Sequence, residues 1–419
     1  MSFLILVVFL GAAAAAIPIA HALLVAALAA AASSDRVPLD ILVQTMVQQV
    51  QSFPLIAIPF FMLTGSLMMG GKLGEALIGV LSSVLGRYHG GPAQVGVLSS
   101  TIFGGVSGSA VADASAIGSL MIPWHKRIGY PPAFSAATLA AAATIDILIP
   151  PSIPMILFAL SSGASIAALF VAGVLPGLLM CGGFMAMCWW VGRSRNFPRE
   201  RAPFDKGLFA KQLLYAAPAL LLPVFIIVFL RFGIATPTEV SILSTLFAGL
   251  VSALVYRDLN LQRLHKAVLD AGLSTGVVLL VIMASSAIGW LLTFDQMPNG
   301  VVIWAKENIA QGWLVILLMN VLMLFCGMFI DLPAAVLLLT PVFVPLAQSI
   351  GMDTVQLGIM MTVNLAIGLY TPPVGTTLFI TSSLAKVKVG QTVRELGPFY
   401  LVAFGVLALV SYVPASILR

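Results

Sequence analysis

Two pairs of adjacent prolines, Pro150-Pro151 and Pro372-Pro373, interrupt long apolar stretches of the sequence. Proline has no backbone N–H to donate, and its ring clashes with the carbonyl one turn earlier, so no regular helix continues through either pair. The residue before a proline is also driven out of the α region. In a lipid bilayer, broken backbone is tolerated only where protein or a water-filled cavity surrounds it. Each pair therefore predicts a membrane helix that breaks into two halves.

The composition places these breaks in a membrane protein. Of the 419 residues, 60% are hydrophobic and 8% are charged, and the mean hydropathy is +1.09, whereas a soluble domain carries roughly 25% charged residues. The basic residues lie in short loops between apolar runs, which favours membrane orientation by positive charge over nucleic-acid binding. We expect an all-α polytopic membrane protein. Uninterrupted runs long enough to span, at about 20 residues, are 3–32, 53–70, 166–191, 212–230, 234–256, 271–292 and 399–417.

Two further apolar stretches, 91–123 and 313–345, carry breakers in their interiors. The first contains Gly-Gly-Val-Ser-Gly at 104–108, and the second is interrupted between Gly327 and Pro333. These breakers predict two re-entrant helical hairpins rather than two continuous spans. An amphipathic segment precedes each hairpin and is predicted to lie in the membrane interface, although a short span is the alternative for the first.

The two halves of the chain share one register. Adding 222 to residue numbers maps Pro150-Pro151 onto Pro372-Pro373 (372 − 150 = 222), Gly105 onto Gly327 and Pro123 onto Pro345. Prolines and glycines that fall on a single register predict an internal repeat. Each copy would contain one re-entrant hairpin and one helix broken by Pro-Pro.

The distribution of basic residues predicts the orientation of these copies. If the N-terminus is cytoplasmic and the C-terminus periplasmic, 16 of the 20 Lys and Arg fall inside. Only Arg36, Arg231, Lys306 and Arg419 then fall outside, in agreement with the positive-inside rule. The two hairpins would open on opposite sides, so the repeats have inverted topology. In secondary transporters of this plan, the substrate and ion sites lie near the membrane midplane.

The expected division of the chain follows from these elements. It comprises scaffold helices at 1–70, an interfacial arm helix at 71–90, the first half of a transport unit at 91–163, scaffold helices with a cytoplasmic loop (193–211) at 164–296, a second arm at 297–312, the second half of the transport unit at 313–386 and a C-terminal helix at 387–419.

Oxygen atoms freed at the helix breaks are the candidate ligands for a hard cation such as Na⁺. Small residues can equally serve only to let helices approach closely, and the acids near membrane depth, Asp113, Asp146 and Asp331, can cap helix starts. The predicted sodium-binding residues are Ser107, Gly108, Ser109, Asp146, Ile149, Pro150, Gly327, Asp331, Gly368, Thr371, Pro372 and Gly375. The predicted substrate-binding residues are Ser107, Ser109, Ser152 and Thr376.

No enzyme signature accompanies these residues. The run Gly-Gly-Val-Ser-Gly-Ser at 104–109 lacks the preceding strand and the histidine partner of a nucleophile elbow. The Gly-rich motif of phosphate-binding loops is absent. The cysteines and histidines show no metal-type spacing. We therefore expect no enzyme, no organic cofactor and Na⁺ as the only metal.

The hairpin sequence 103–118, Ile-Pro-Pro-Ser at 149–152 and Thr-Pro-Pro-Val-Gly at 371–375 resemble the large membrane subunit of tripartite ATP-independent periplasmic (TRAP) transporters. The resemblance covers nearly the whole chain. It implies a bacterial inner-membrane protein that works by an elevator movement with a small four-helix membrane subunit and a periplasmic binding protein. It also implies Na⁺-driven uptake of an organic anion, such as a C4-dicarboxylate, a sialic acid or another sugar acid.

Two other functions fit the same pattern. One is a Na⁺/carboxylate symporter or antiporter that needs no binding protein, although the Ser-Asn-Thr hairpin tips of related dicarboxylate symporters are missing here. The other is a channel or a purely structural subunit. Uptake with and without a binding protein separates the first function from the TRAP type, and accumulation against a gradient excludes a channel.

Overall fold

The computed structural model describes residues 1–419 except 16, 35–36, 70–71, 200–204 and 415–419. Every regular element within the described ranges is helical, which confirms the all-α prediction. By length and apolar composition, five helices in these ranges can each cross a membrane, or up to eight if each bent pair counts as one span. Of the basic residues used for orientation, Arg36, Arg201 and Arg419 lie outside the described residues.

The N-terminal part of the chain corrects one prediction. The run 3–32 is not one span, because the first helix ends at Ala14, a second helix begins after Pro18, and the two helices pack against each other. Small side chains such as Ala26 and Ala30 are fully buried and let helices pack closely. The elements are α1 (Ser2–Ala14), α2 (Ile19–Ala32), α3 (Leu39–Val50), η1 (Phe53–Ile56) and α4 (Ala57–Met69); the helix axis bends by 55° between α3 and the η1–α4 segment.

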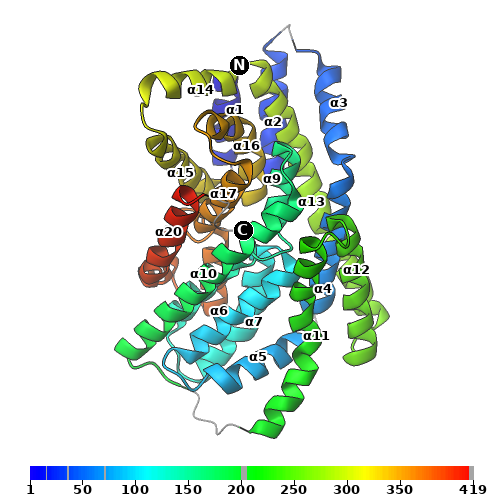
Figure 1. Cartoon of the computed structure of the whole chain (residues 1–419), viewed down its shortest axis with the longest axis vertical. Helices are drawn as coiled ribbons and strands as arrows, with labels where there is room; N and C mark the ends of the chain where they lie inside the picture. Colours follow the sequence, from blue (N-terminus) through cyan, green and yellow to red (C-terminus); the bar gives the residue numbers. More distant parts are fainter. Residues whose placement is uncertain (16, 35–36, 70–71, 200–204, 415–419) are drawn as a thin grey trace.

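The N-terminus is held by a contact with the end of a long central helix. The backbone N–H and the hydroxyl of Ser2 both donate to Asp295 Oδ2, at 2.8 and 2.5 Å. The N-terminus therefore lies at the end of α13 (Leu261–Phe294), opposite the end of the molecule where α5 (Lys72–Leu85) and the start of α11 (Lys206–Arg231) lie (Figure 1). The cytoplasmic placement of the N-terminus stays a prediction.

The first half contains the first hairpin and the first broken helix. The first hairpin consists of α6 and α7, and Gly108 and Ser109 join them. The first break, residues 146–152, separates the η2 turn from α9. The elements are α6 (Gly91–Ser107), α7 (Ala110–Arg127), α8 (Pro132–Ala142), η2 (Ala143–Ile145) and α9 (Ile153–Ser162).

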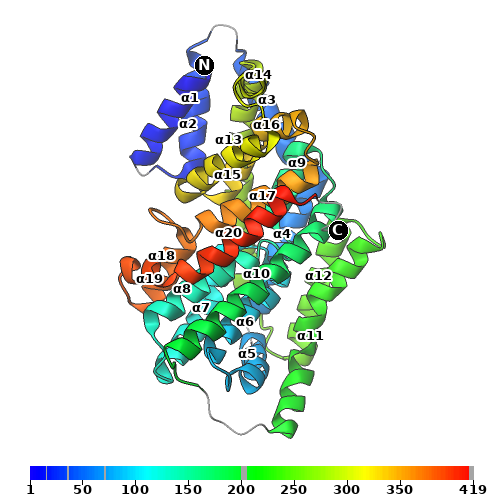
Figure 2. The ribbon, with the colours of Figure 1, turned by 60° about the vertical axis from the view of Figure 1, so that its left-hand side comes forward.

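The second half repeats this order of elements. The second hairpin consists of α15 and α16, joined by Ile330 and Asp331, and the second break is residues 369–375. The two hairpins lie in opposite ends of the molecule (Figure 2). The elements are α14 (Met297–Asn308), α15 (Gly312–Phe329), α16 (Leu332–Ser349), α17 (Thr354–Gly368), α18 (Thr376–Ala385), α19 (Val389–Glu395) and α20 (Gly397–Tyr412). Between the halves lie α10 (Ile166–Ser194), α11, α12 (Pro237–Leu250), η3 (Val251–Val255) and α13.

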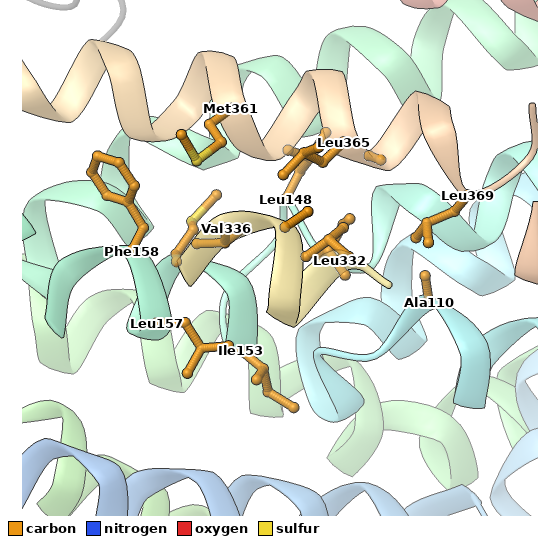
Figure 3. Close-up of a cluster of buried hydrophobic side chains, with 14 of the residues drawn as sticks. Ala110, Leu148, Ile153, Leu157, Phe158, Leu332, Val336, Met361, Leu365 and Leu369 are labelled. Carbon is orange, nitrogen blue, oxygen red and sulfur yellow. The ribbon is translucent and has the colours of Figure 1, made fainter. Parts of the chain in front are cut away.

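The core couples the two halves crosswise. The distal part of the first broken helix, α9, packs against α16 and α17 of the second half, and α18 of the second half packs against α7 and α8 of the first. Figure 3 shows Leu157 and Phe158 of α9 beside Val336 of α16 and Met361 of α17. Each broken helix therefore crosses from its own half into the other.

Replacing Phe158 with alanine tests this coupling. Phe158 is fully buried, so its truncation leaves a cavity and is expected to cost about 3–5 kcal/mol of stability. Phe404→Ala in α20 is the matched control, because that ring is 42% exposed. Thermal unfolding of the purified variants in detergent should show a much larger loss for Phe158→Ala, and equal losses would contradict the packing.

Candidate functional site

The Asp146 carboxylate holds the tip of the first hairpin. The Ser107 hydroxyl donates to Asp146 Oδ2 at 2.7 Å, and the backbone N–H groups of Gly108 and Ser109 donate to Oδ1 and Oδ2 at 3.0 Å each. Asp146 is fully buried, and hydrogen bonds to an ionised carboxylate are among the stronger ones in proteins. Of the interpretations left open for Asp146, the geometry favours capping, and the capped backbone belongs to the first hairpin.

At Gly108, where this tip meets the first break, only glycine fits the backbone conformation and the available space. Its φ is +63°, and a Cβ there would lie 2.6 Å from the Pro151 carbonyl oxygen. Ser109 then begins α7, because its hydroxyl accepts from the Ala112 N–H at 3.4 Å. The tip and the break are thus fitted to each other through main-chain atoms.

The first break supplies carbonyl oxygens at the same place. The Ser152 hydroxyl donates to the Ile147 carbonyl at 2.6 Å, which links the two ends of the break. It also accepts from the Met155 N–H at 3.4 Å, which caps the start of α9. Within the described residues, no hydrogen bond reaches the carbonyl oxygens of Ile149 and Pro150. These two oxygens therefore remain available to a ligand.

The second break has a comparable geometry with different partners. The Thr371 hydroxyl donates to the Ile367 carbonyl at 2.6 Å. Gly375, with φ +42°, faces the Thr371 carbonyl, since a Cβ there would be 3.0 Å from that oxygen. A Cβ on Gly368 would lie 2.5 Å from the Gly327 carbonyl, so the second hairpin touches the second break backbone to backbone.

Asp331 behaves differently from Asp146. It occupies the N-cap position of α16, but its side chain makes no capping hydrogen bond. It lines both of the cavities described below and is the only charged residue in the linings drawn from the described residues apart from the imidazole of His21. The capping interpretation of Asp331 therefore finds no side-chain hydrogen bond to α16, and the residue lies on the cavity lining.

Both hairpin tips and both breaks border one cavity of about 760 Å³. Its lining includes Gly108, Ser109, Asp331, Pro373 and Thr376, and one side is closed by α13, with Ser274, Val277 and Val278. A second cavity of about 340 Å³ reaches Gly327, Gly375 and the α1–α2 turn, and it shares Asp331 and Thr376 with the first. A cavity of several hundred Å³ with few polar groups is typical of small-molecule sites.

The predicted site residues divide into two groups. Gly108, Ser109, Gly327, Asp331, Gly375 and Thr376 line the cavities. The others belong to the tips and breaks but are not part of either lining: Ser107, Asp146, Ile149, Pro150, Ser152, Gly368, Thr371 and Pro372.

Two features escaped the sequence reasoning. The first is the wall contributed by α13, whose Ser274 carries no break or repeat signal. The second is Thr377, whose hydroxyl lies 3.1 Å from the Ala140 carbonyl and 2.9 Å from that of Leu369 and so joins α18 to α8. Thr377 directly follows a predicted site residue, and its position two residues after the break is the signal that pointed to it.

The donor set of the site suits a monovalent cation and an anion held by dipoles. Among the described residues, no group of three or more His, Cys, Asp and Glu side chains comes together as for a transition metal. The oxygens at the tips and breaks are carbonyls and hydroxyls, which are hard ligands. Lys and Arg are absent from the described cavity linings, and helix N-termini at Ala110, Leu332 and Thr376 present partial positive charge there.

A solved structure has a similar fold. The YdaH transporter of Alcanivorax borkumensis matches over 89% of this chain and 88% of its own, with a TM-score of 0.63 and 17% sequence identity. At this identity the likeness establishes the helical transporter fold alone.

Sequence comparison extends to the whole chain. An uncharacterized protein of Sinorhizobium fredii, y4mL, is 52% identical over 415 residues, covering 99% of each chain. The 2,3-diketo-L-gulonate TRAP transporter large permease YiaN of Escherichia coli is 35% identical over 98% of this chain and 96% of its own. The sialic acid TRAP transporter large permease SiaM of Vibrio cholerae is 34% identical over 96% and 93%.

The sequence model of one family, the DctM component of tripartite ATP-independent periplasmic transporters, matches residues 6–416. This match confirms the resemblance noted in the hairpin and break sequences. The chain is a membrane transport protein and belongs to the DctM family of TRAP transporter large permeases.

Proposed function

We propose that this chain carries a small organic anion into the bacterial cytoplasm across the inner membrane, coupled to Na⁺. The observation that carries the proposal is the convergence of both hairpin tips and both breaks on one cavity of about 760 Å³. Its size fits a molecule such as a C4-dicarboxylate or a sugar acid. The names of YiaN and SiaM, which specify 2,3-diketo-L-gulonate and sialic acid, support this substrate class.

The proposed Na⁺ sites lie where the tips meet the breaks. The Pro151 carbonyl faces the tip held by Asp146, and the Ile149 and Pro150 carbonyls of the same break accept no hydrogen bond among the described residues. In the other half, the Gly327 and Thr371 carbonyls face Gly368 and Gly375. Cation binding at either junction would draw a tip onto its break. The anion would then bind between the two tips, with its carboxylate on Ser109, Thr376 and the helix N-termini.

We further propose that the hairpins and breaks move as one transport unit against a scaffold, with the two halves as inverted repeats. The constant difference of 222 residues and the opposed hairpins in Figure 2 support the repeats. The crosswise packing of α9 and α18 supports movement as one body. The cavity wall on α13 would be the surface along which the unit slides.

The partners follow from the family description. The word tripartite implies three components, and a large permease implies a small one. We propose that a small four-helix membrane subunit assembles with this chain in the bilayer and that a periplasmic protein delivers the anion. A Na⁺/carboxylate symporter that needs no binding protein is the alternative.

Removing the hydroxyl of Ser107 tests the Na⁺ site. Ser107→Ala breaks the 2.7 Å bond to Asp146 and loosens the tip, so the half-saturating Na⁺ concentration for uptake should rise about two- to tenfold, as for the loss of ~0.5–1.5 kcal/mol. The assay is uptake into proteoliposomes at varied Na⁺. Ser119→Ala on the exposed face of α7 is the control, and equal curves for the two variants would refute the assignment.

Thr376 tests the substrate site separately. Its hydroxyl is buried without a partner among the described residues, and Thr376 lines both cavities. Thr376→Val should raise the KM for the anion by about tenfold or less, because one neutral hydrogen bond is lost, with a smaller change in Na⁺ half-saturation. Thr45→Val, in α3 and outside both cavity linings, controls for the substitution. If the half-saturating Na⁺ concentration changes and the KM for the anion does not, Thr376 belongs to the cation site and not to the substrate site.

The requirement for a binding protein is tested in the same vesicles. Uptake should need the small subunit and a soluble binding protein added outside, and it should proceed against an anion gradient when Na⁺ is higher outside. Uptake of the free anion without any binding protein would favour the symporter alternative. Flux that only equalises the anion across the membrane would indicate a channel.

A further inference from the structure

Asp113 is a buried acid that the proposed site does not use. It lies on α7, one helical turn beyond the tip, and its N–H donates to the Ser109 carbonyl at 3.0 Å. Its side chain is fully buried, and neither carboxylate oxygen has a hydrogen-bond partner among the described residues. Leaving an ionised carboxylate in such a place costs several kcal/mol. A residue of this kind within a membrane protein is by default functional.

The surroundings of Asp113 are polar but carry no positive charge. The Ser100 hydroxyl of α6 lies beside the Asp113 carboxylate, and it too is buried without a hydrogen-bond partner in the described part of the chain. Asp146 lies on the other side of the same tip residue, because its Oδ2 accepts from the N–H of Ser109, whose carbonyl accepts from the Asp113 N–H. Within the described residues, neither acid forms an ion pair with a Lys, Arg or His side chain. Two carboxylates are therefore enclosed together with no compensating charge from the protein.

The two acids are not equivalent. Asp146 already accepts three hydrogen bonds from the tip, whereas both oxygens of Asp113 are open. Ser100 adds a neutral oxygen. Two carboxylates and one hydroxyl without further acids give a small site of hard oxygens, which suits a monovalent cation better than Ca²⁺ with its six to eight ligands.

We propose that the carboxylates of Asp113 and Asp146 and the hydroxyl of Ser100 form an additional Na⁺ site inside the first hairpin, one helical turn from the tip. Its occupation neutralises the buried pair and holds α6, α7 and the first break together. The inference rests on the proposed Na⁺ coupling and adds to it: the first hairpin would bind one cation at its tip and one between its helices.

The substitution Asp113→Asn tests this site by thermal unfolding. The variant removes an uncompensated buried charge, so in Na⁺-free choline chloride it should unfold at the same temperature as the unmodified protein or higher. Added NaCl should stabilise the unmodified protein more than the variant, since a ligand bound only by the native state raises the unfolding temperature. Asp270→Asn is the matched control, because Asp270 lies on an exposed face of α13, and it should keep the full response to NaCl.

Two outcomes would overturn the site. An NaCl response of Asp113→Asn equal to that of the control excludes a cation at Asp113. A stability difference that follows pH and not Na⁺ means that the carboxyl holds a proton instead. Ser100→Ala, which keeps both acids, should weaken the NaCl response about two- to tenfold in half-saturating concentration.

The Na⁺ dependence of uptake shows whether a failure concerns the additional site at Asp113 or the proposed Na⁺ coupling itself. If it holds, Asp113→Asn lowers the Hill coefficient for Na⁺ while Asp270→Asn leaves it unchanged. If uptake by the unmodified protein does not depend on Na⁺, the proposed coupling fails, and the unfolding experiment still decides whether Asp113 binds the ion. If uptake depends on Na⁺ with an unchanged Hill coefficient in Asp113→Asn, only the additional site fails.

Discussion

The structure depends on satisfying main-chain groups where helices stop inside the protein. At such a point lipid offers no hydrogen bonds, so each free N–H or carbonyl needs a partner from the chain or from a ligand. In the first half the partner is the Asp146 carboxylate, which accepts from both N–H groups of the tip. In the second half no acid among the described residues takes this place, and Gly368 lies directly against the Gly327 backbone. In the first half a carboxylate satisfies the main-chain groups of the tip, and in the second half two backbones pack directly against each other.

This difference has a consequence for ion binding. A carboxylate beside the first tip already brings negative charge to that junction, and Asp113 adds a second such charge one turn away. The junction in the second half has only neutral oxygens around Gly368, while Asp331 faces the cavity. Under the proposed Na⁺ coupling, the first junction would therefore attract a cation more strongly than the second, and the second would depend more on the carbonyl geometry that Gly375 permits.

Much of the architecture could be read from the sequence because its signals are local. Gly108 in a left-handed conformation and Pro333 in the first turn of α16 mark the hairpin interiors where they were expected. Pro150-Pro151 and Pro372-Pro373 mark the breaks. The division of 3–32 into α1 and α2 was missed because a lone proline, Pro18, in an alanine-rich run resembles a kink. The role of Asp146 was uncertain because its partners lie 37 to 39 residues away, and the Thr377–Ala140 bond joins residues 237 positions apart.

The crosswise packing of the broken helices bears on how the chain folds. The partners of α9 on α16 and α17 begin only at Leu332, so the apolar face around Phe158 has no native cover until that part of the chain has been synthesised. Contacts between segments so far apart form late and slowly, and uncovered apolar or polar surface in the meantime favours misassembly. The same feature that makes the two halves one body thus delays the completion of the site until nearly the entire chain has entered the membrane.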